Sequence, residues 1–505
     1  MSEVETINSG KASTGIEGLD YILKGGLSRN RLYLVQGNPG TGKTTMGLQF
    51  LLEGERKGEK GLYITLSESK EELLAVGNSH GWNLEHLTIH DLTVSGDTLR
   101  DDSRYTVFHP AEVELDETTR EVLNEVERVN PARVVFDSLS EMRMLASDPL
   151  RFRRQILALK QYFIGRKCTV ILLDDRTAEV THRQLESIAH GVINLEYVLT
   201  EYGKQRHNLR VVKMRGVNFQ SGSHDYNIET GGIVVFPRLD APDVKQPFKS
   251  GTLKSNLGDL EELLGGLDYG TSTIFTGPAG IGKSTMSMMY VQTAAENGER
   301  SVVYLFDENV ETLYQRTSAL GLNIRKYVEA GLVNIRQIKL AELTPGELAH
   351  LVRVEVEQND TRLVLIDSVN GYLMSTPQER FLTMQFHELL SYLNRKGVVS
   401  ILVVGQYGLI GTMQSPIDMS YLADTVVLLR YFESGGEVRQ AMSVLKKRTG
   451  RHERTIREFR IDKGGIQLGQ PLKDFHGVLT GVPVYHGKGE RLMEKGSSDD
   501  NEGKQ

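Results

Sequence analysis

A glycine-rich segment near the start of the chain combines the residue types that bind the phosphates of a nucleotide. It consists of Gly37, Asn38, Pro39, Gly40, Thr41, Gly42, Lys43 and Thr44, and Thr45 follows it. Glycines let main-chain N–H groups fold around phosphate oxygens, the lysine reaches the β- and γ-phosphates, and the threonine hydroxyl ligates Mg²⁺. We therefore predict a P-loop that binds ATP and Mg²⁺.

A second segment with the same spacing lies in the second half of the chain. It consists of Gly277, Pro278, Ala279, Gly280, Ile281, Gly282, Lys283 and Ser284, followed by Thr285. An apolar, strand-like run precedes each segment and a helical pattern follows it, which is the context that a P-loop requires. The alternative, a glycine-rich turn with a chance Gly-Lys-Thr, is weakened by this second copy.

An aspartate ends an apolar run in each half of the chain. Asp137 follows residues 133–136, and Asp367 follows residues 362–366. Ligands of open α/β sheets bind at the carboxyl ends of the strands, so we expect these carboxylates to hold Mg²⁺ opposite the hydroxyls of Thr44 and Ser284. The alternative is that each aspartate only caps the helix that follows.

Cleavage of the β–γ bond of ATP also needs a group that orients or deprotonates the attacking water. Glu68 and Glu308 are the candidates, since each stands 25 positions after a P-loop lysine and ends an apolar run. Asp307 directly precedes Glu308 and can share or replace its role. The alternative is that these carboxylates cap helices that begin near residues 71 and 311.

A lysine, followed two positions later by an arginine, ends a β-rich segment in each half. These residues are Lys213 and Arg215 in the first half and Lys446 and Arg448 in the second. Positive side chains of this kind stabilise the charge that develops on the γ-phosphate when a neighbouring subunit supplies them. The alternative, solvated charges at strand ends, is weakened by their recurrence.

These landmarks recur at nearly constant offsets, which indicates an internal duplication. Lys43 and Lys283 lie 240 positions apart, and so do Glu68 and Glu308. Apolar strand patterns alternate with helical patterns in both halves. We therefore predict an α/β fold of two tandem domains, each with a mainly parallel central sheet.

The repeat and the interruptions of periodicity suggest domain limits. We expect an N-terminal arm over residues 1–11, a first domain over 12–240, a linker over 241–255 and a second domain over 256–486. Prolines and charged residues break the periodicity at the linker. The polar residues 487–505 form a tail that we expect to be disordered.

The composition is that of an ordinary globular protein. The 505 residues are 39% hydrophobic and 25% charged, with a net charge of −7. No stretch approaches the roughly 18 apolar residues of a membrane span, and the first residues lack the pattern of a signal peptide, so we expect a cytoplasmic protein without a membrane partner. The acidic balance argues against nucleic acid as the main partner. The single cysteine, Cys168, lies in an apolar run and is expected to be a core residue.

Over residues 13–483 the chain resembles the KaiC family of circadian-clock ATPases, a branch of the RecA-like P-loop proteins. The resemblance rests on the lead-in Ser13–Asp20, both P-loops, the acidic strand ends, both Asp-Ser strand ends and both Lys-x-Arg pairs. It implies two RecA-like P-loop NTPase domains in a two-tier homohexamer with ATP·Mg²⁺ at the subunit interfaces. It further implies a slow ATPase in the first domain, an autokinase in the second, Lys-x-Arg pairs that reach the adjacent subunit, and Kai-type or other signalling proteins as partners.

The chain departs from the family pattern in two respects. The family has two adjacent glutamates at the strand end, whereas the first of each pair here is Ser67 or Asp307. The family's adjacent serine and threonine phosphoacceptors correspond here to Ser420 and Tyr421. The resemblance thus implies phosphorylation of Ser420 but no two-site serine/threonine cycle, in a protein that acts as a signalling or timing switch.

Two other functions stay open at this point. One is a DNA-stimulated ATPase of the wider RecA/RadA-like class, for which the basic stretch at residues 151–154 is the best contact candidate. The other is a scaffold that ATP assembles and that binds other proteins.

Overall fold

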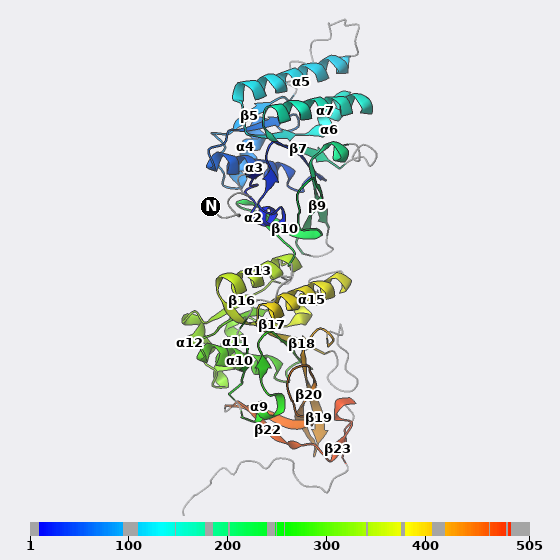
Figure 1. Ribbon diagram of the computed structural model, residues 1–505. Coiled ribbons are helices and arrows are strands. Elements are labelled where there is room, and N and C mark those ends of the chain that lie inside the picture. Colours follow the sequence, from blue (N-terminus) through cyan, green and yellow to red (C-terminus); the bar gives the residue numbers. More distant parts are fainter. Residues whose placement is uncertain are drawn as a thin grey trace, which may run out of the picture. The chain divides into compact units, whose positions relative to one another are not determined.

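The computed structural model describes residues 10–93, 110–146, 148–176, 185–199, 203–239, 248, 250–256, 258–339, 342–374, 379–406, 420–463, 465–480 and 483–485. The chain forms two compact units, Met1–Arg238 and Leu239–Gln505 (Figure 1). The predicted tail at residues 487–505 lies outside the described residues.

The first unit is built on a nine-stranded sheet with the order β11-β10-β9-β8-β3-β7-β6-β4-β5. Neighbouring strands from β8 to β5 are parallel, and β9, β10 and β11 continue the sheet in antiparallel fashion. The strands are β3 (Leu32–Gly37), β4 (Gly61–Thr65), β5 (Thr88–Asp91), β6 (Arg133–Asp137), β7 (Thr169–Asp175), β8 (Gly191–Val198), β9 (Arg206–Met214), β10 (Ser223–Glu229) and β11 (Gly232–Phe236).

Helices cover both faces of this sheet (Figure 1). One face carries α2 (Glu17–Ile22), α3 (Lys43–Arg56) and α4 (Lys70–Ser79), and the other carries α5 (Pro110–Val129), α6 (Leu139–Ala146) and α7 (Pro149–Gly165). Because successive strand residues point to opposite faces, Val135 joins the first core while Val134 and Phe136 join the second. Full burial of each such side chain contributes roughly 1.5–3 kcal/mol. Cys168 is buried in the second core, as predicted.

The second unit repeats this plan, with the sheet order β16-β15-β17-β18-β14-β19-β20-β21-β22. Its strands are β14 (Ser272–Gly277), β15 (Arg300–Leu305), β16 (Val333–Gln337), β17 (Thr361–Asp367), β18 (Val399–Gly405), β19 (Thr425–Ser434), β20 (Glu437–Lys447), β21 (Arg457–Asp462) and β22 (Gly465–Pro471). One face carries α9 (Gly258–Leu264), α10 (Lys283–Glu296), α11 (Val310–Ala319) and α12 (Ile324–Glu329), and the other carries α13 (Pro345–Gln358), α14 (Val369–Met374) and α15 (Glu379–Arg395). The predicted fold class, two tandem α/β domains with mainly parallel sheets, is confirmed.

Short strand pairs complete both units. They are β1 (Lys11–Ala12) with β2 (Leu27–Ser28), β12 (Thr252–Leu253) with β13 (Leu267–Asp268), and β23 (Phe475–His476) with β24 (Val484–Tyr485), and a short helix η2 spans Val478–Thr480. The structure thus places the end of the predicted arm in β1 and part of the predicted linker in β12. The sequence did not reveal these strands, because a two-residue strand is too short to carry a periodic pattern. The other predicted domain limits stay predictions.

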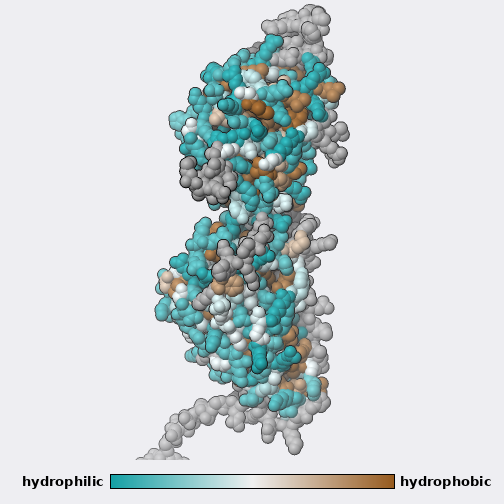
Figure 2. Space-filling view, in the orientation of Figure 1, coloured by the Kyte–Doolittle hydropathy of each residue, from teal (hydrophilic) through white to brown (hydrophobic). Residues whose placement is uncertain are grey.

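Hydrophilic residues predominate on the face shown in Figure 2, with hydrophobic ones interspersed in both units. Among the described residues, no helix is both long and apolar enough to cross a membrane.

Candidate active sites

The first P-loop joins the central strand β3 to α3. Gly42 is the N-cap of α3 and has a φ of 83°, and a Cβ added there would lie 2.9 Å from Ile228 Cδ1. A Cβ at Gly40 would meet no atom within 4 Å, so the main chain of the loop borders open space. Both observations fit a loop whose N–H groups surround an anion at a helix N-terminus.

Lys43 is held in place by three oxygen atoms. Its Nζ donates to the carbonyls of Gly37 at 3.0 Å and Asn38 at 3.1 Å, and it lies 2.7 Å from Asp175 Oδ1. Asp175 ends β7, and its Cα is paired with that of Gly37 across the sheet. The sequence prediction missed Asp175, although an acidic residue at the end of an apolar run was the signal that identified Asp137.

Asp137 ends β6 and faces the P-loop hydroxyl. Thr44 Oγ1 donates to Asp137 Oδ2 at 3.2 Å, and the hydroxyl of Tyr63 donates to the same oxygen at 2.5 Å. Burial raises the pKa of Asp137, against the opposing effects of these hydrogen bonds and of Lys43. Hydroxyl and carboxylate oxygens are ligands that Mg²⁺ accepts, so Thr44 and Asp137 fit this ion. Within the described ranges no group of three or more His, Cys, Asp or Glu surrounds a metal position, so phosphates and water would complete the coordination.

Glu68 lies just beyond the end of β4. Its N–H donates to Thr65 Oγ1 at 3.1 Å, and Thr65 Oγ1 donates to its carbonyl at 2.6 Å. Glu68 Oε2 is buried and, among the described residues, has no hydrogen-bond partner. Burial, followed by the nearby Asp137 carboxylate, raises the pKa of Glu68. The capping alternative is wrong for this residue, because Ser69 caps α4.

The second P-loop has a similar lysine but a different neighbourhood. Lys283 Nζ donates to the carbonyls of Gly277 at 2.9 Å and Pro278 at 2.6 Å. Gly405 occupies the register position opposite Gly277, where the first unit has Asp175. Burial lowers the pKa of Lys283 to about 8, against the opposing charge of Asp367. Burial also raises the pKa of Asp367, against a hydrogen bond from Ser284.

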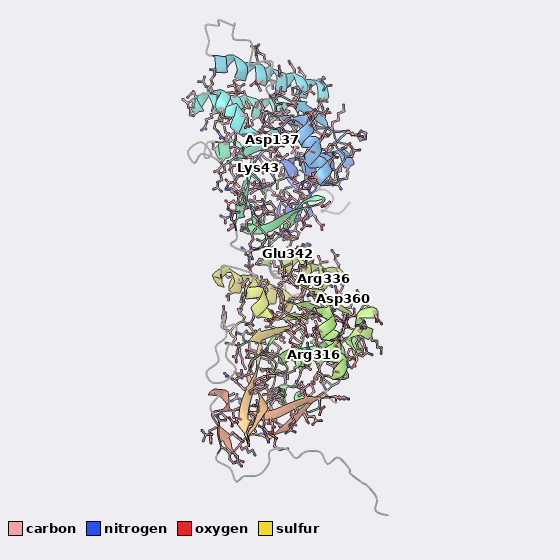
Figure 3. The ribbon with its side chains drawn as sticks, turned by 180° about the vertical axis from the view of Figure 1, so that it is seen from behind. Lys43, Asp137, Arg316, Arg336, Glu342 and Asp360 are labelled. Carbon is pink, nitrogen blue, oxygen red and sulfur yellow. The ribbon has the colours of Figure 1, made fainter. Side chains whose placement is uncertain are left out.

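The acidic pair of the second site is engaged by other side chains. Asp307 accepts a hydrogen bond from Ser368. Glu308 forms an ion pair with Arg316 at 2.9 Å (Figure 3 marks Arg316). Asn309, rather than Glu308, caps α11. Figure 3 also marks Lys43 and Asp137 in the first unit. The sequence prediction missed Arg316, since nothing in its local pattern distinguishes it from other charges on an exposed helix face.

The Lys-x-Arg pairs contact backbone carbonyls just before β8 and β19. Lys213 Nζ donates to Glu186 O at 2.5 Å and Ala189 O at 3.0 Å, and Lys446 Nζ donates to Ser420 O at 2.9 Å and Ala423 O at 2.8 Å. The two arginines also donate to backbone carbonyls in these segments, Arg215 to Ser187 O at 2.7 Å and Arg448 to Tyr421 O at 3.1 Å.

These pairs lie at the end of the sheet opposite to the P-loop of their own unit. β3 and β8 are parallel, with Tyr33 opposite Gly191 and Gly37 opposite Leu195. The P-loop leaves β3 after Gly37, whereas the lysine and arginine lie beside the start of β8. The same holds for β14 and β19 in the second unit. The Lys-x-Arg pair of each unit therefore lies away from the γ-phosphate position of that same unit.

Ser420 lies five positions before the first residue of β19 and is exposed. It shares the position of the Lys-x-Arg pair, away from the P-loop of its own unit. The basic stretch at residues 151–154 lies in α7, where Phe152 is buried under the guanidinium of Arg143 at 5.4 Å. Because its one aromatic ring belongs to the core, this stretch lacks the stacking surface that single-stranded nucleic acid needs.

Comparison with known proteins gives a consistent result. A family model described as "ATPase: KaiC" matches residues 12–240 and 253–473. The circadian clock protein KaiC3 of Synechocystis sp. is 27% identical over 504 residues, which cover 97% of this chain and 98% of the relative. The circadian clock oscillator protein KaiC of Parathermosynechococcus lividus is 26% identical over 485 residues, covering 94% and 88%. That of Parasynechococcus marenigrum is 25% identical over 480 residues, covering 94% and 93%. The resemblance inferred from the sequence is confirmed, and the chain belongs to the KaiC family of ATPases, with two tandem RecA-like domains.

Proposed function

We propose that the chain is a slow ATPase that works as a ring of identical subunits, with Glu68 as the base of the first site. The observation that carries the proposal is the half-buried Glu68 carboxylate, whose buried oxygen Oε2 has no partner among the described residues and whose pKa is raised. A carboxylate with these properties accepts a proton more readily than an ordinary surface glutamate.

ATP binds through the P-loop. Main-chain N–H groups of residues 40–44 would contact the phosphates, and the Lys43 ammonium would leave Asp175 to contact phosphate oxygens. Thr44 and Asp137 would hold Mg²⁺ in the first unit, and Ser284 and Asp367 in the second. When bound, this ion neutralises charge on the β- and γ-phosphates.

Hydrolysis then proceeds by attack of water on the γ-phosphorus. The water oxygen forms a bond to phosphorus, the bond to the bridging oxygen breaks, and its electron pair leaves with ADP. Glu68 accepts the proton from the water. Lys213 and Arg215 of a neighbouring copy stabilise the charge that develops on the transferred group. Their distance from the P-loop of their own unit supports this arrangement in trans.

In the second unit, Ser420 is proposed as the acceptor of a γ-phosphoryl group. Its hydroxyl oxygen attacks the γ-phosphorus of ATP bound by a neighbouring copy, and ADP leaves. Asp307 or Glu308 is the proposed base, and Lys446 and Arg448 stabilise the transferred charge. Slow hydrolysis with self-phosphorylation gives states that can differ in affinity for a signalling partner, so the chain would act as a signalling or timing switch.

The decisive experiment measures phosphate release and phosphopeptides in one sample of full-length protein with ATP and Mg²⁺. We expect phosphate release that the double variant Lys43→Ala, Lys283→Ala abolishes. Mass spectrometry should find phosphate on Ser420, and Ser420→Ala should remove it. Retained turnover in the double lysine variant would reject the ATPase assignment, and unphosphorylated Ser420 would reject the autokinase assignment.

A further inference from the structure

The two sites differ in the surroundings of the candidate base, and the difference traces to one arginine. Arg316 on α11 contacts both carboxylate oxygens of Glu308, with Nε 3.2 Å from Oε1 and Nη2 2.9 Å from Oε2. Its third nitrogen, Nη1, donates to Thr285 Oγ1 at 2.8 Å. The guanidinium therefore links the acidic residue after β15 to the first turn of the P-loop helix α10.

The equivalent position in the first unit carries no charge. α4 and α11 begin 240 positions apart, as the two P-loop lysines do, so Val76 takes the place of Arg316. Val76 packs against the apolar core. Thr45 Oγ1 instead lies 3.4 Å from His80 Nε2. No arginine at this helix position can therefore contact Glu68. This agrees with the buried oxygen Oε2 of Glu68, which has no hydrogen-bond partner in the described part of the chain.

This difference bears directly on proton transfer. Hydrogen bonds between a guanidinium and a carboxylate are roughly twice as strong as neutral ones, and here they occupy both oxygens of Glu308. The neighbouring Asp307 already accepts from Ser368. A water in the second site therefore shares the Glu308 carboxylate with Arg316, which fixes the orientation of that carboxylate and uses one lone pair on each of its oxygens.

We propose that Arg316 is a positioning residue that restrains ATP hydrolysis at the second site by holding Glu308 away from the attacking water. The inference rests on the proposed function, because it takes both units to bind ATP and Glu308 to be a candidate base of the second. Its consequence is that water attacks ATP more slowly at the second site than at the first.

The test uses full-length protein carrying Glu68→Gln, so that phosphate release reports on the second site. Adding Arg316→Gln should raise kcat at least about tenfold, a part of the 10²- to 10⁴-fold that a well-placed base contributes. The KM for ATP should change less than kcat does, since Arg316 contacts both oxygens of the candidate base but reaches the P-loop helix only through Thr285. Arg316→Lys, which keeps the charge but lacks the planar pair of donors that the guanidinium presents to the carboxylate, should give a smaller gain. Adding Glu308→Gln should remove the gain.

The matched control is Arg325→Gln, which removes an exposed pair with Glu311 at 3.0 Å on the adjoining helices and should leave turnover unchanged. Unchanged or reduced kcat in Arg316→Lys and Arg316→Gln would overturn the inference, and so would a gain that survives Glu308→Gln. If Arg316→Gln does not fold, Arg316→Lys alone decides. Phosphate release that persists in Glu68→Gln, Lys283→Ala would instead reject the proposed function.

Discussion

The ion pair between Lys43 and Asp175 allows a quantitative prediction for the first site, because ATP has to compete with this carboxylate for the lysine. Lys43 Nζ lies 2.7 Å from Asp175 Oδ1, and the two side chains are 10% and 28% exposed. Asp175→Asn keeps the shape of the side chain and removes its charge. The phosphates then compete only with neutral oxygens.

The magnitude follows from the geometry of the pair. At 2.7 Å, unit charges attract by about 6 kcal/mol at an effective dielectric constant of about 20. The cost of removing the charges from water offsets most of this attraction. Because Asp175 stays partly exposed, we expect a net effect of about 1–2 kcal/mol, close to that of a hydrogen bond to a charged group. The affinity for ATP should therefore rise about five- to thirtyfold.

Titration with a fluorescent ATP analogue and Mg²⁺ measures this change, in a Lys283→Ala background that silences the second site. Glu196→Gln is the control, since it removes an exposed pair with Arg176 close to β7 and should leave the affinity unchanged. An affinity in Asp175→Asn that is equal to or weaker than that of the parent protein would refute the competition.

Three further outcomes are expected. Glu68→Gln should lower kcat for phosphate release by about 10²- to 10⁴-fold with little change in bound nucleotide, and a drop of less than twofold would contradict its role. Because burial raises the pKa of Glu68, phosphate release should fall as the pH drops through a pKa above the ordinary value of 4.5, and a pH-independent rate would contradict this. Gly42→Ala should lower the free energy of unfolding by at least about 1–2 kcal/mol, because alanine is strained at the left-handed φ of this position. Denaturant titration measures this change, and an unchanged free energy of unfolding would contradict the expected strain.

Features that depend on residues close together in the sequence could be predicted from the sequence alone. The P-loops, the acidic strand ends and the alternation of strands and helices are local patterns, so both sheets and the positions of Lys43 and Asp137 followed from them. The pairing of Thr44 with Asp137 was also predictable, since parallel strands bring their carboxyl ends to one edge of a sheet.

The features that the sequence did not reveal depend on strand order or on side-chain packing. Asp175 meets Lys43 only because β7 is the neighbour of β3, an order that no local pattern specifies. Arg316 meets Glu308 because one turn of α11 faces the end of β15. The location of Lys213 away from its own P-loop likewise depends on the register of β8 and β9.

In each sheet the P-loop lies at one end and the Lys-x-Arg pair lies at the other, so each subunit has two chemically different ends. If a neighbouring copy supplies the cationic end, as proposed, contacts between subunits are head-to-tail, and they either close into a ring or extend into a filament. On that proposal, two inactive proteins should complement each other. A subunit lacking Lys43 can still offer its Lys213 and Arg215 to a neighbour that lacks those two but keeps an intact P-loop, so mixing the two restores a working junction.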